Sequence, residues 1–126
     1  MGMAKKGTFD AELFFASLAD RTRLRLLNLM RDGEVCVCFL ADTLGTNDPK
    51  ISRHLSYLKR ADLVTARRDG KWMHYSIKQP ADSNAREILK TTLELVSTYP
   101  EMKNDRKRLI NVCCPPKPVA IVRRKG

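Results

Sequence analysis

The sequence lacks any apolar segment long enough to cross a bilayer. A membrane-spanning helix needs about 20 mostly apolar residues, and no run in this chain of 126 residues approaches that length. Two lysines lie within residues 1–6, but the apolar stretch of a secretory signal does not follow them. We therefore expect a cytoplasmic protein that makes no contact with a membrane.

Cysteines are also few, and their distribution excludes one common role. Four cysteines in a reducing compartment do not indicate a disulfide framework. They occur as two close pairs, Cys36 with Cys38 and Cys113 with Cys114. Paired, reduced thiols predict ligands.

Acidic residues are too few to balance the basic ones. Lys and Arg total 24 against 14 Asp and Glu, which gives a net charge of +10. This charge favours a nucleic acid partner, although a solvated basic surface would produce it equally well. The chain has no Cys-x-x-Cys motif, no glycine-rich phosphate loop and no nucleophile beside a recognisable base, so we expect that it is not an enzyme.

Helical periodicity and capping residues predict four successive helices in the first half of the chain. Apolar residues recur at helical spacing over 9–18 and again over 20–30, where an aspartate is suited to cap the second helix. A short third helix over 36–44 ends at Gly45, which adopts a left-handed conformation easily. An asparagine cap followed by proline starts a fourth helix over 47–60.

The periodicity then changes to that of strands. Segments 63–68 and 71–77 flank Asp69-Gly70, a dipeptide suited to a tight hairpin turn. A short helix, a glycine-containing turn, a second helix and a hairpin are typical of a winged helix-turn-helix. The predicted fold is therefore mainly α with a β-hairpin wing.

A last helix, beginning at 82 or 83 and running to residue 99, is predicted to serve dimerisation. One broad face of this helix needs a cover, and the first and last helices of two chains would cover each other across a two-fold axis. We therefore expect a homodimer, whose symmetry matches that of a palindromic operator. The residues of this face are Ile88, Leu89, Thr92, Leu95, Val96 and Tyr99.

The expected organisation has three parts. Residues 1–7 are predicted to be a disordered N-terminal tail, and residues 8–100 to be the winged helix-turn-helix domain that binds DNA and dimerises. Residues 101–126 are predicted to be a C-terminal tail that carries the vicinal cysteine pair. Three prolines at 115, 116 and 118 exclude a continuing helix there and favour an extended chain.

The fourth predicted helix has a buried and an exposed side. Ile51, Leu55 and Leu58 fall in one narrow sector, which predicts the core-facing side, and His54 lies beside that sector as a packed histidine. The opposite side carries donors suited to base edges and phosphates of double-stranded DNA. The predicted DNA-contacting residues of this helix are Lys50, Ser52, Arg53, Ser56, Tyr57 and Arg60.

The tip of the hairpin carries a cluster of cations. Arg67, Arg68 and Lys71 are predicted to bind backbone phosphates or an adjacent minor groove. The apolar residues that follow the turn, Trp72 among them, are expected to anchor the hairpin to the core instead of contacting bases.

Four segments together resemble the ArsR/SmtB family of repressors. They are Leu18-Ala-Asp-Arg-Thr-Arg-Leu-Arg-Leu-Leu26, Glu34-Val-Cys-Val-Cys-Phe-Leu40, Ile51-Ser-Arg-His-Leu-Ser-Tyr-Leu-Lys59 and Asp69-Gly-Lys-Trp-Met-His-Tyr75. The resemblance extends from about residue 9 to residue 99. It implies a dimeric winged-helix repressor that leaves its operator when it binds a toxic metal or metalloid, here As(III) to derepress arsenic resistance genes.

The resemblance also implies that Cys36 and Cys38 are ligands of this ion. Thiols at the start of a helix are expected to have lowered pKa values. Two cysteines at positions i and i+2 can face one ion only where the helix is not regular, so ion binding should distort the third helix. Many arsenic sensors have a further cysteine that this chain replaces with Ala41, so Cys113 or Cys114 would have to supply the third thiolate. Methylarsenite, Cd²⁺ or Zn²⁺ as the effector, and a thiol redox switch, remain open alternatives.

Overall fold

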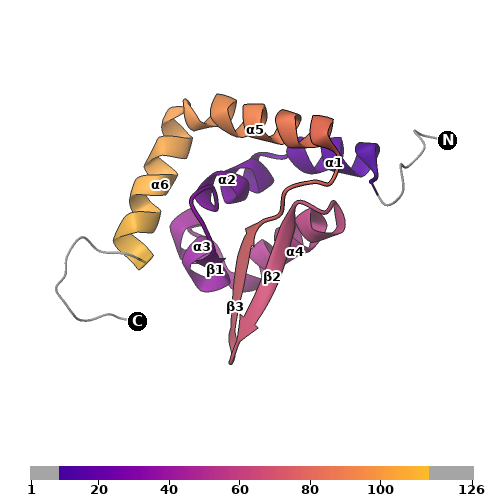
Figure 1. Ribbon diagram of the computed structural model, residues 1–126. Helices are drawn as coiled ribbons and strands as arrows, with labels where there is room; N and C mark the ends of the chain where they lie inside the picture. Colours follow the sequence, from indigo (N-terminus) through magenta and orange to yellow (C-terminus); the bar gives the residue numbers. More distant parts are fainter. Residues whose placement is uncertain (1–8, 114–126) are drawn as a thin grey trace.

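The computed structural model describes residues 9–113 and is mainly helical, with a three-stranded antiparallel sheet (Figure 1). The strand order of the sheet is β1-β3-β2. Within the described residues, no helix has the length and apolar character needed to span a bilayer. The elements are α1 (Ala11–Leu18), α2 (Arg21–Leu29), β1 (Val35–Cys36), α3 (Val37–Leu44), α4 (Asp48–Arg60), β2 (Val64–Asp69), β3 (Trp72–Ile77), α5 (Ser83–Ser97) and α6 (Pro100–Cys113).

Local capping interactions define the helix-turn-helix as predicted. Asp20 accepts a hydrogen bond from the backbone N–H of Arg23 at 3.0 Å and so starts α2. Gly45 ends α3 with a φ of 69°, a left-handed conformation that costs glycine little. Asn47 then accepts from the N–H of Lys50 at 2.9 Å, which starts α4 directly after the turn.

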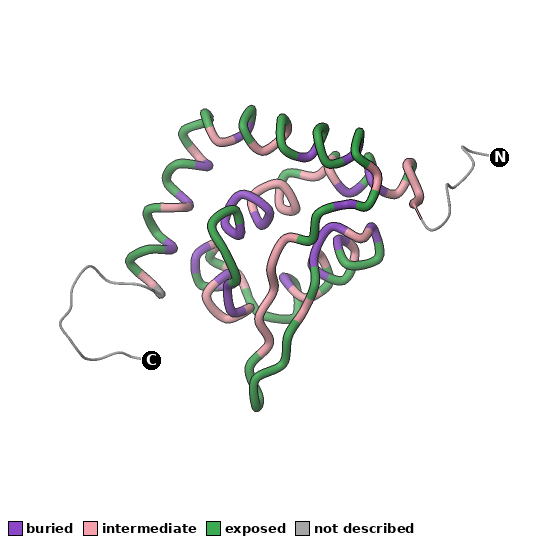
Figure 2. Tube along the Cα trace, in the orientation of Figure 1, coloured by how far each residue is buried: buried purple, intermediate pink, exposed green. Residues whose placement is uncertain are grey.

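The core lies where α2, α3 and α4 meet the base of the wing (Figure 2). Ile51, Leu55 and Leu58 are fully buried, which confirms the predicted inward side of α4. They share one apolar cluster with buried residues of the neighbouring helices, including Leu26 and Leu40. Because α3 packs against α4, a change in the position of α3 will displace the second helix of the motif.

The wing is a two-stranded hairpin with one short additional strand. Strands β2 and β3 pair so that Asp69 lies opposite Trp72, and Gly70 in the turn has a φ of 64°. Strand β1 pairs with β3 through only two positions, one of them Cys36 opposite His74. Sequence analysis missed β1 because two residues are too short to show a period of two.

The outward face of α5 differs from the prediction. Leu89 and Val96 are buried against the chain's own core, whereas Ile88, Leu95 and Tyr99 are 37%, 57% and 51% exposed. The predicted single face is therefore divided into a core-facing part and an uncovered apolar strip. Phe15 of α1, also about half exposed, adds to the apolar surface available to a partner.

Residues 100–113 form helix α6, whereas we predicted an extended tail from residue 101 onwards. Pro100 occupies the first turn, where its missing N–H costs nothing, and the prolines at 115, 116 and 118 come only after the helix has ended. α6 packs against α2 and α3 and buries Met102 and Leu109. The predicted N-terminal tail over 1–7 and residues 114–126 lie outside the described residues.

An ion pair within this interface ties α6 to α2. The carboxylate of Asp105 is completely buried and accepts two hydrogen bonds from Arg25, at 2.8 and 2.9 Å. Arg108, one turn further along α6, also pairs with Asp105 and donates to the carbonyl oxygen of Thr43 near the end of α3. α6 is therefore attached to α2 and to α3.

Candidate DNA-binding surface and cysteine site

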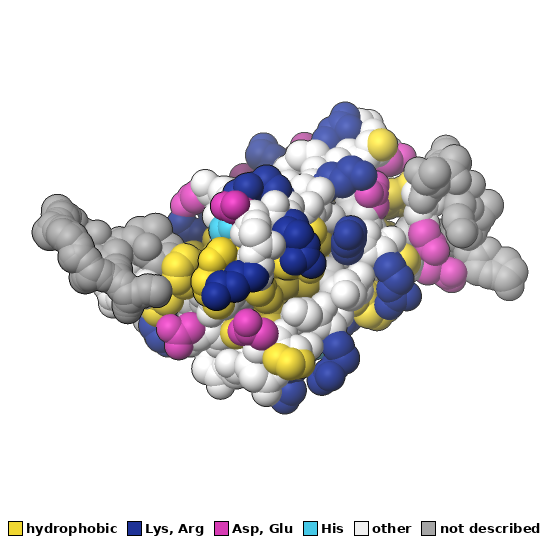
Figure 3. Space-filling view, turned by 90° about the horizontal axis from the view of Figure 1, so that it is seen from below, with side chains coloured by type: hydrophobic (Ala, Val, Ile, Leu, Met, Phe, Trp, Pro, Cys, Tyr) yellow, Lys and Arg dark blue, Asp and Glu magenta, His cyan; other side chains and the backbone are white. Residues whose placement is uncertain are grey.

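The side chains predicted to contact DNA lie on the outer side of α4. Lys50, Arg53, Ser56 and Arg60 are exposed, and Ser52 and Tyr57 are partly exposed. We call these six side chains the recognition surface. Seen from the side to which the wing points, Lys and Arg side chains are distributed across the molecule, with some acidic side chains between them (Figure 3). The predicted hydrogen-bond donors therefore lie on one exposed side of α4, which a DNA duplex can approach.

A hollow of about 510 Å³ opens on this side of the molecule, lined mainly by residues of α4. The ring of Tyr57 forms part of its wall, and two guanidinium groups lie near that ring. The guanidinium carbon of Arg60 is 4.9 Å from the ring centroid, and that of Arg23, from α2, is 4.0 Å away. The hollow thus combines aromatic and cationic groups, the chemistry that suits a phosphate backbone.

Arg23 is a residue of this region that sequence analysis missed. Its side chain donates hydrogen bonds of 3.0 Å to the carbonyl oxygens of Ala16 and Ser17, at the end of α1. These bonds fix the guanidinium against Tyr57. The contact joins elements far apart in the sequence, and no periodicity or motif indicated it.

His54 lies beside the recognition surface but turns toward the α1–α2 junction. Its side chain is 26% exposed, and its Nδ1 lies 3.8 Å from Oδ2 of Asp20, the residue that caps α2. His54 is therefore only partly buried and lines the same hollow as Tyr57, so the prediction of a packed core histidine is met only in part.

The cations of the wing have different surroundings. Arg67 forms two hydrogen bonds with Glu34, at 2.8 and 3.0 Å, and this pair lowers the pKa of the Glu34 carboxyl. Arg68 donates to the carbonyl oxygen of Gly70 at 3.3 Å. Lys71 is exposed at the tip, and its Nζ is 5.4 Å from the centre of the Trp72 ring. Arg67 is thus held by a carboxylate, whereas Arg68 and Lys71 lie at the end of the hairpin.

The expectation that Trp72 anchors the wing to the core is wrong. The side chain is 48% exposed, while Tyr75 and Ile77 on the same strand pack against the core cluster. Side chains alternate between the two faces of a strand, so Trp72 lies on the face opposite to these two residues.

Cys36 and Cys38 lie close together where β1 passes into α3. Cys36 is the N-cap of α3 and has an extended backbone, with a φ of −69° and a ψ of 142°. This extended residue brings the two sulfur atoms to 3.0 Å, although an i, i+2 pair would diverge within a regular helix. Cys36 is buried and Cys38 partly exposed. Two thiols in this arrangement can bind one soft ion from the side of Cys38.

The pKa of Cys38 differs from the expectation for a thiol at a helix start. Burial, together with the adjacent sulfur of Cys36, raises the pKa of Cys38 to about 11. Loss of hydration and the neighbouring thiol therefore outweigh the stabilisation of a thiolate by the helix dipole. At neutral pH the Cys38 thiol is protonated.

One of the two candidates for the third thiol is at the end of α6. Cys113 is the last residue of that helix, and the preceding turn, with Leu109 and Ile110, lies beside the segment 32–35 that leads into Cys36. The side chain of Cys113 and the whole of Cys114 lie outside the described part of the chain. Among the described residues no group of three or more His, Cys, Asp or Glu side chains could hold a metal ion. Participation of Cys113 or Cys114 therefore remains a prediction.

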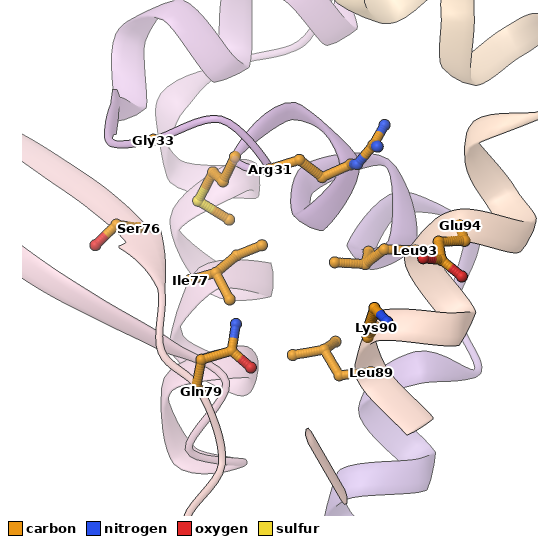
Figure 4. Close-up of a pocket in the computed structure, with 10 residues that line it drawn as sticks. Arg31, Gly33, Ser76, Ile77, Gln79, Leu89, Lys90, Leu93 and Glu94 are labelled. Atoms are coloured by element: carbon orange, nitrogen blue, oxygen red, sulfur yellow. The ribbon is translucent and has the colours of Figure 1, made fainter. Parts of the chain in front are cut away.

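A second hollow, of about 380 Å³, lies between the end of α2, the base of β3 and α5 (Figure 4). Ile77 and Leu89 contribute apolar side chains, and Arg31, Lys90 and Glu94 contribute charged ones. None of the predicted DNA or metal ligands lines it. The side of α5 that lines this hollow differs from the side that carries the uncovered strip of Ile88, Leu95 and Tyr99.

Comparison with known proteins agrees with this architecture. Residues 20–66 match the family model described as "Bacterial regulatory protein, arsR family". The chain is 37% identical to the arsenic resistance transcriptional regulator ArsR2 of Pseudomonas putida, over 79% of this chain and 94% of that protein. It is 42% identical to the arsenical resistance operon repressor of Escherichia coli K12, over 60% of this chain and 65% of the repressor.

Similarity to solved structures supports the same conclusion. The AntR antimony-specific transcriptional repressor superposes with a TM-score of 0.55 and 34% sequence identity, covering 70% of this chain and 78% of AntR. This superposition confirms the predicted winged helix-turn-helix fold. The arsR family consists of regulatory proteins, in agreement with the expectation that the chain is not an enzyme. The helix-turn-helix, the wing and the extent of the match to ArsR2 show that the chain belongs to the arsR family of bacterial regulatory proteins.

Proposed function

We propose that this protein is a metalloid-responsive transcriptional repressor that binds operator DNA as a homodimer and is released when As(III) binds its cysteines. The observation that carries the proposal is the pair of sulfur atoms 3.0 Å apart at the start of α3, the helix that packs against α4. The similarity to arsenic resistance regulators of P. putida and E. coli supports As(III) as the effector and arsenic resistance genes as the target.

A homodimer is supported by the apolar surface left uncovered on α1 and α5. Leu95 and Tyr99 are both more than half exposed, and Phe15 is close to half exposed. Large apolar side chains left exposed to water favour association, because burial removes them from water. A two-fold dimer would present two copies of α4 to the two halves of a palindromic site.

The thiols provide a route from effector to DNA. Each thiol that binds arsenous acid replaces one hydroxide on arsenic, and the thiol proton leaves with that hydroxide as water. Cys36 and Cys38 supply two such thiols, and we propose Cys113 or Cys114 as the third. Cys36 and Cys38 already lie close enough to share one ion, so the bond to the third thiol would be the one that displaces the first turn of α3. The packing of α3 on α4 would carry this displacement to the recognition surface.

The raised pKa of Cys38 predicts different pH dependences for the candidate effectors. Cd²⁺ must displace the proton that Cys38 holds below its pKa of about 11, so its affinity should rise about tenfold per pH unit for each proton released. Arsenous acid gains no such advantage, because each displaced proton leaves as water. Titration calorimetry of the reduced protein between pH 6 and pH 8 should show this contrast, and a Cd²⁺ affinity independent of pH would contradict it.

The proposed function is tested by fluorescence anisotropy of the reduced protein on the promoter DNA of its own gene, titrated with arsenite, methylarsenite, Cd²⁺ and Zn²⁺. We expect arsenite to release the DNA, and Cys113→Ser or Cys114→Ser to weaken the response if that residue is the third ligand. Release by none of the four effectors would refute the metalloid-sensing proposal. Release by peroxide that dithiothreitol reverses would instead assign a redox switch, in which Cys36 and Cys38 form a disulfide as peroxide is reduced to water.

A further inference from the structure

Trp72 is an exposed aromatic side chain at the tip of a hairpin that projects from the body of the molecule (Figure 1). It begins β3, opposite Asp69 at the end of β2. An indole is a large apolar group, and about half of this one remains in contact with water. The core therefore does not account for a tryptophan at this position.

The sequence around Trp72 is mainly cationic, with Arg67, Arg68 and Lys71 and a single carboxylate, that of Asp69, in residues 67–71. Asp69 lies directly opposite Trp72, whereas Arg68 lies opposite Met73, on the other face of the hairpin. The ammonium group of Lys71 lies 5.4 Å from the centre of the ring. The edge of a DNA groove is a surface of this complementary kind, because apolar deoxyribose rings alternate there with anionic phosphates. A flat indole with a cation beside it can therefore contact a sugar and a phosphate together.

The proposed dimer surface does not account for this exposure either. The apolar strip on α5 lies at the opposite end of the molecule from the wing tip (Figure 1). Trp72 is five residues from Ile77 at the base of β3, which corresponds to about 17 Å along an antiparallel strand. A partner that covers α1 and α5 would therefore leave the indole open.

We propose that Trp72 is a DNA contact of the wing: its indole packs against the deoxyribose rings that border the operator's minor groove, beside a phosphate bound by Lys71. This inference rests on the proposed DNA-binding function and extends the recognition surface to an apolar group. The indole contributes affinity by covering the C–H groups of the sugars. That contribution is independent of salt, unlike the contribution of the neighbouring cations.

Acrylamide quenching of tryptophan fluorescence tests the contact directly, because Trp72 is the only tryptophan in the chain. We expect the quenching constant of the wild-type protein to fall at least threefold when operator DNA saturates it. Anisotropy of labelled operator in the same samples reports whether the DNA is bound. Bound operator with an unchanged quenching constant would overturn this inference alone, whereas failure to bind any DNA would overturn the proposed function and this inference with it.

Two variants separate the apolar contact from the ionic ones. Trp72→Ala should weaken operator binding about tenfold, comparable with the loss of one aromatic contact to nucleic acid, and leave the dependence on salt unchanged. Lys71→Gln, the matched control at the adjacent position, should lower the slope of log K against log salt by about one. Lys71 is exposed and about half of the Trp72 side chain is in water, so both variants should remain folded, which a thermal unfolding transition of each variant checks. Operator affinity of Trp72→Ala within twofold of wild type would refute the contact.

Discussion

Cys36→Ser is expected to abolish release of operator DNA by arsenite while leaving operator binding intact. Serine replaces a soft sulfur ligand with a hydroxyl oxygen, for which As(III) and Cd²⁺ have far lower affinity. It also suits the N-cap position that Cys36 occupies, so α3 should still form. In an anisotropy titration, the arsenite concentration at half release should rise more than 100-fold.

Val37→Ala provides the matched control for this substitution. Val37 lies between the two cysteines, and its replacement alters the same turn without removing a sulfur atom. We expect this variant to respond to arsenite as the wild type does, and Cys38→Ser to fail as Cys36→Ser does. If Cys36→Ser releases DNA at the wild-type arsenite concentration, the cysteine pair is not the effector site.

Asp105→Ala is expected to lower the free energy of unfolding by about 3 kcal/mol. The substitution removes a completely buried carboxylate and leaves Arg25, whose side chain is only 18% exposed, without its bidentate partner. Arg25 would keep only its longer contact with Glu101, at 3.7 Å, and a largely buried guanidinium without a close partner is costly because it has lost its hydration. Urea denaturation followed by circular dichroism measures the change.

Asp32→Ala is the corresponding control at the protein surface. Asp32 also forms an ion pair with α6, through Arg106, but its side chain is 77% exposed. Exposed ion pairs contribute little, so the expected loss is below about 1 kcal/mol. Equal losses for Asp105→Ala and Asp32→Ala would show that the buried pair does not hold α6 in place.

The parts of the fold that depend on neighbouring residues were predictable from the sequence. Asn47 followed by proline starts α4, and Gly45 ends α3, because the backbone at each position needs a particular side chain or its absence. The inward side of α4 followed from helical periodicity alone. The family resemblance implied that Cys36 and Cys38 face one ion, which an i, i+2 pair can do only outside a regular helix, and in the structure Cys36 is extended and the two sulfur atoms lie 3.0 Å apart.

The parts that depend on contacts between distant elements were not predictable. Nothing near Asp105 in the sequence indicates that its carboxylate will be buried against Arg25. Without that contact, the charged sequence of α6 predicts a tail. The contact of Arg23 with Tyr57 and the exposure of Trp72 depend likewise on tertiary arrangement. The raised pKa of Cys38 reflects burial, which the position of a residue in a helix does not reveal.

Cys36 belongs to two elements at once, and this affects how quickly repression can end. It pairs with His74 of the wing through β1, and it caps α3, which packs against α4. Neither cysteine is part of the recognition surface, and Cys38 is partly exposed, so under the proposed function an ion would reach the pair while DNA is bound. The dissociation rate of the complex should then rise with ion concentration. Gene expression would begin on the timescale of ion entry, without waiting for the repressor to leave its operator spontaneously.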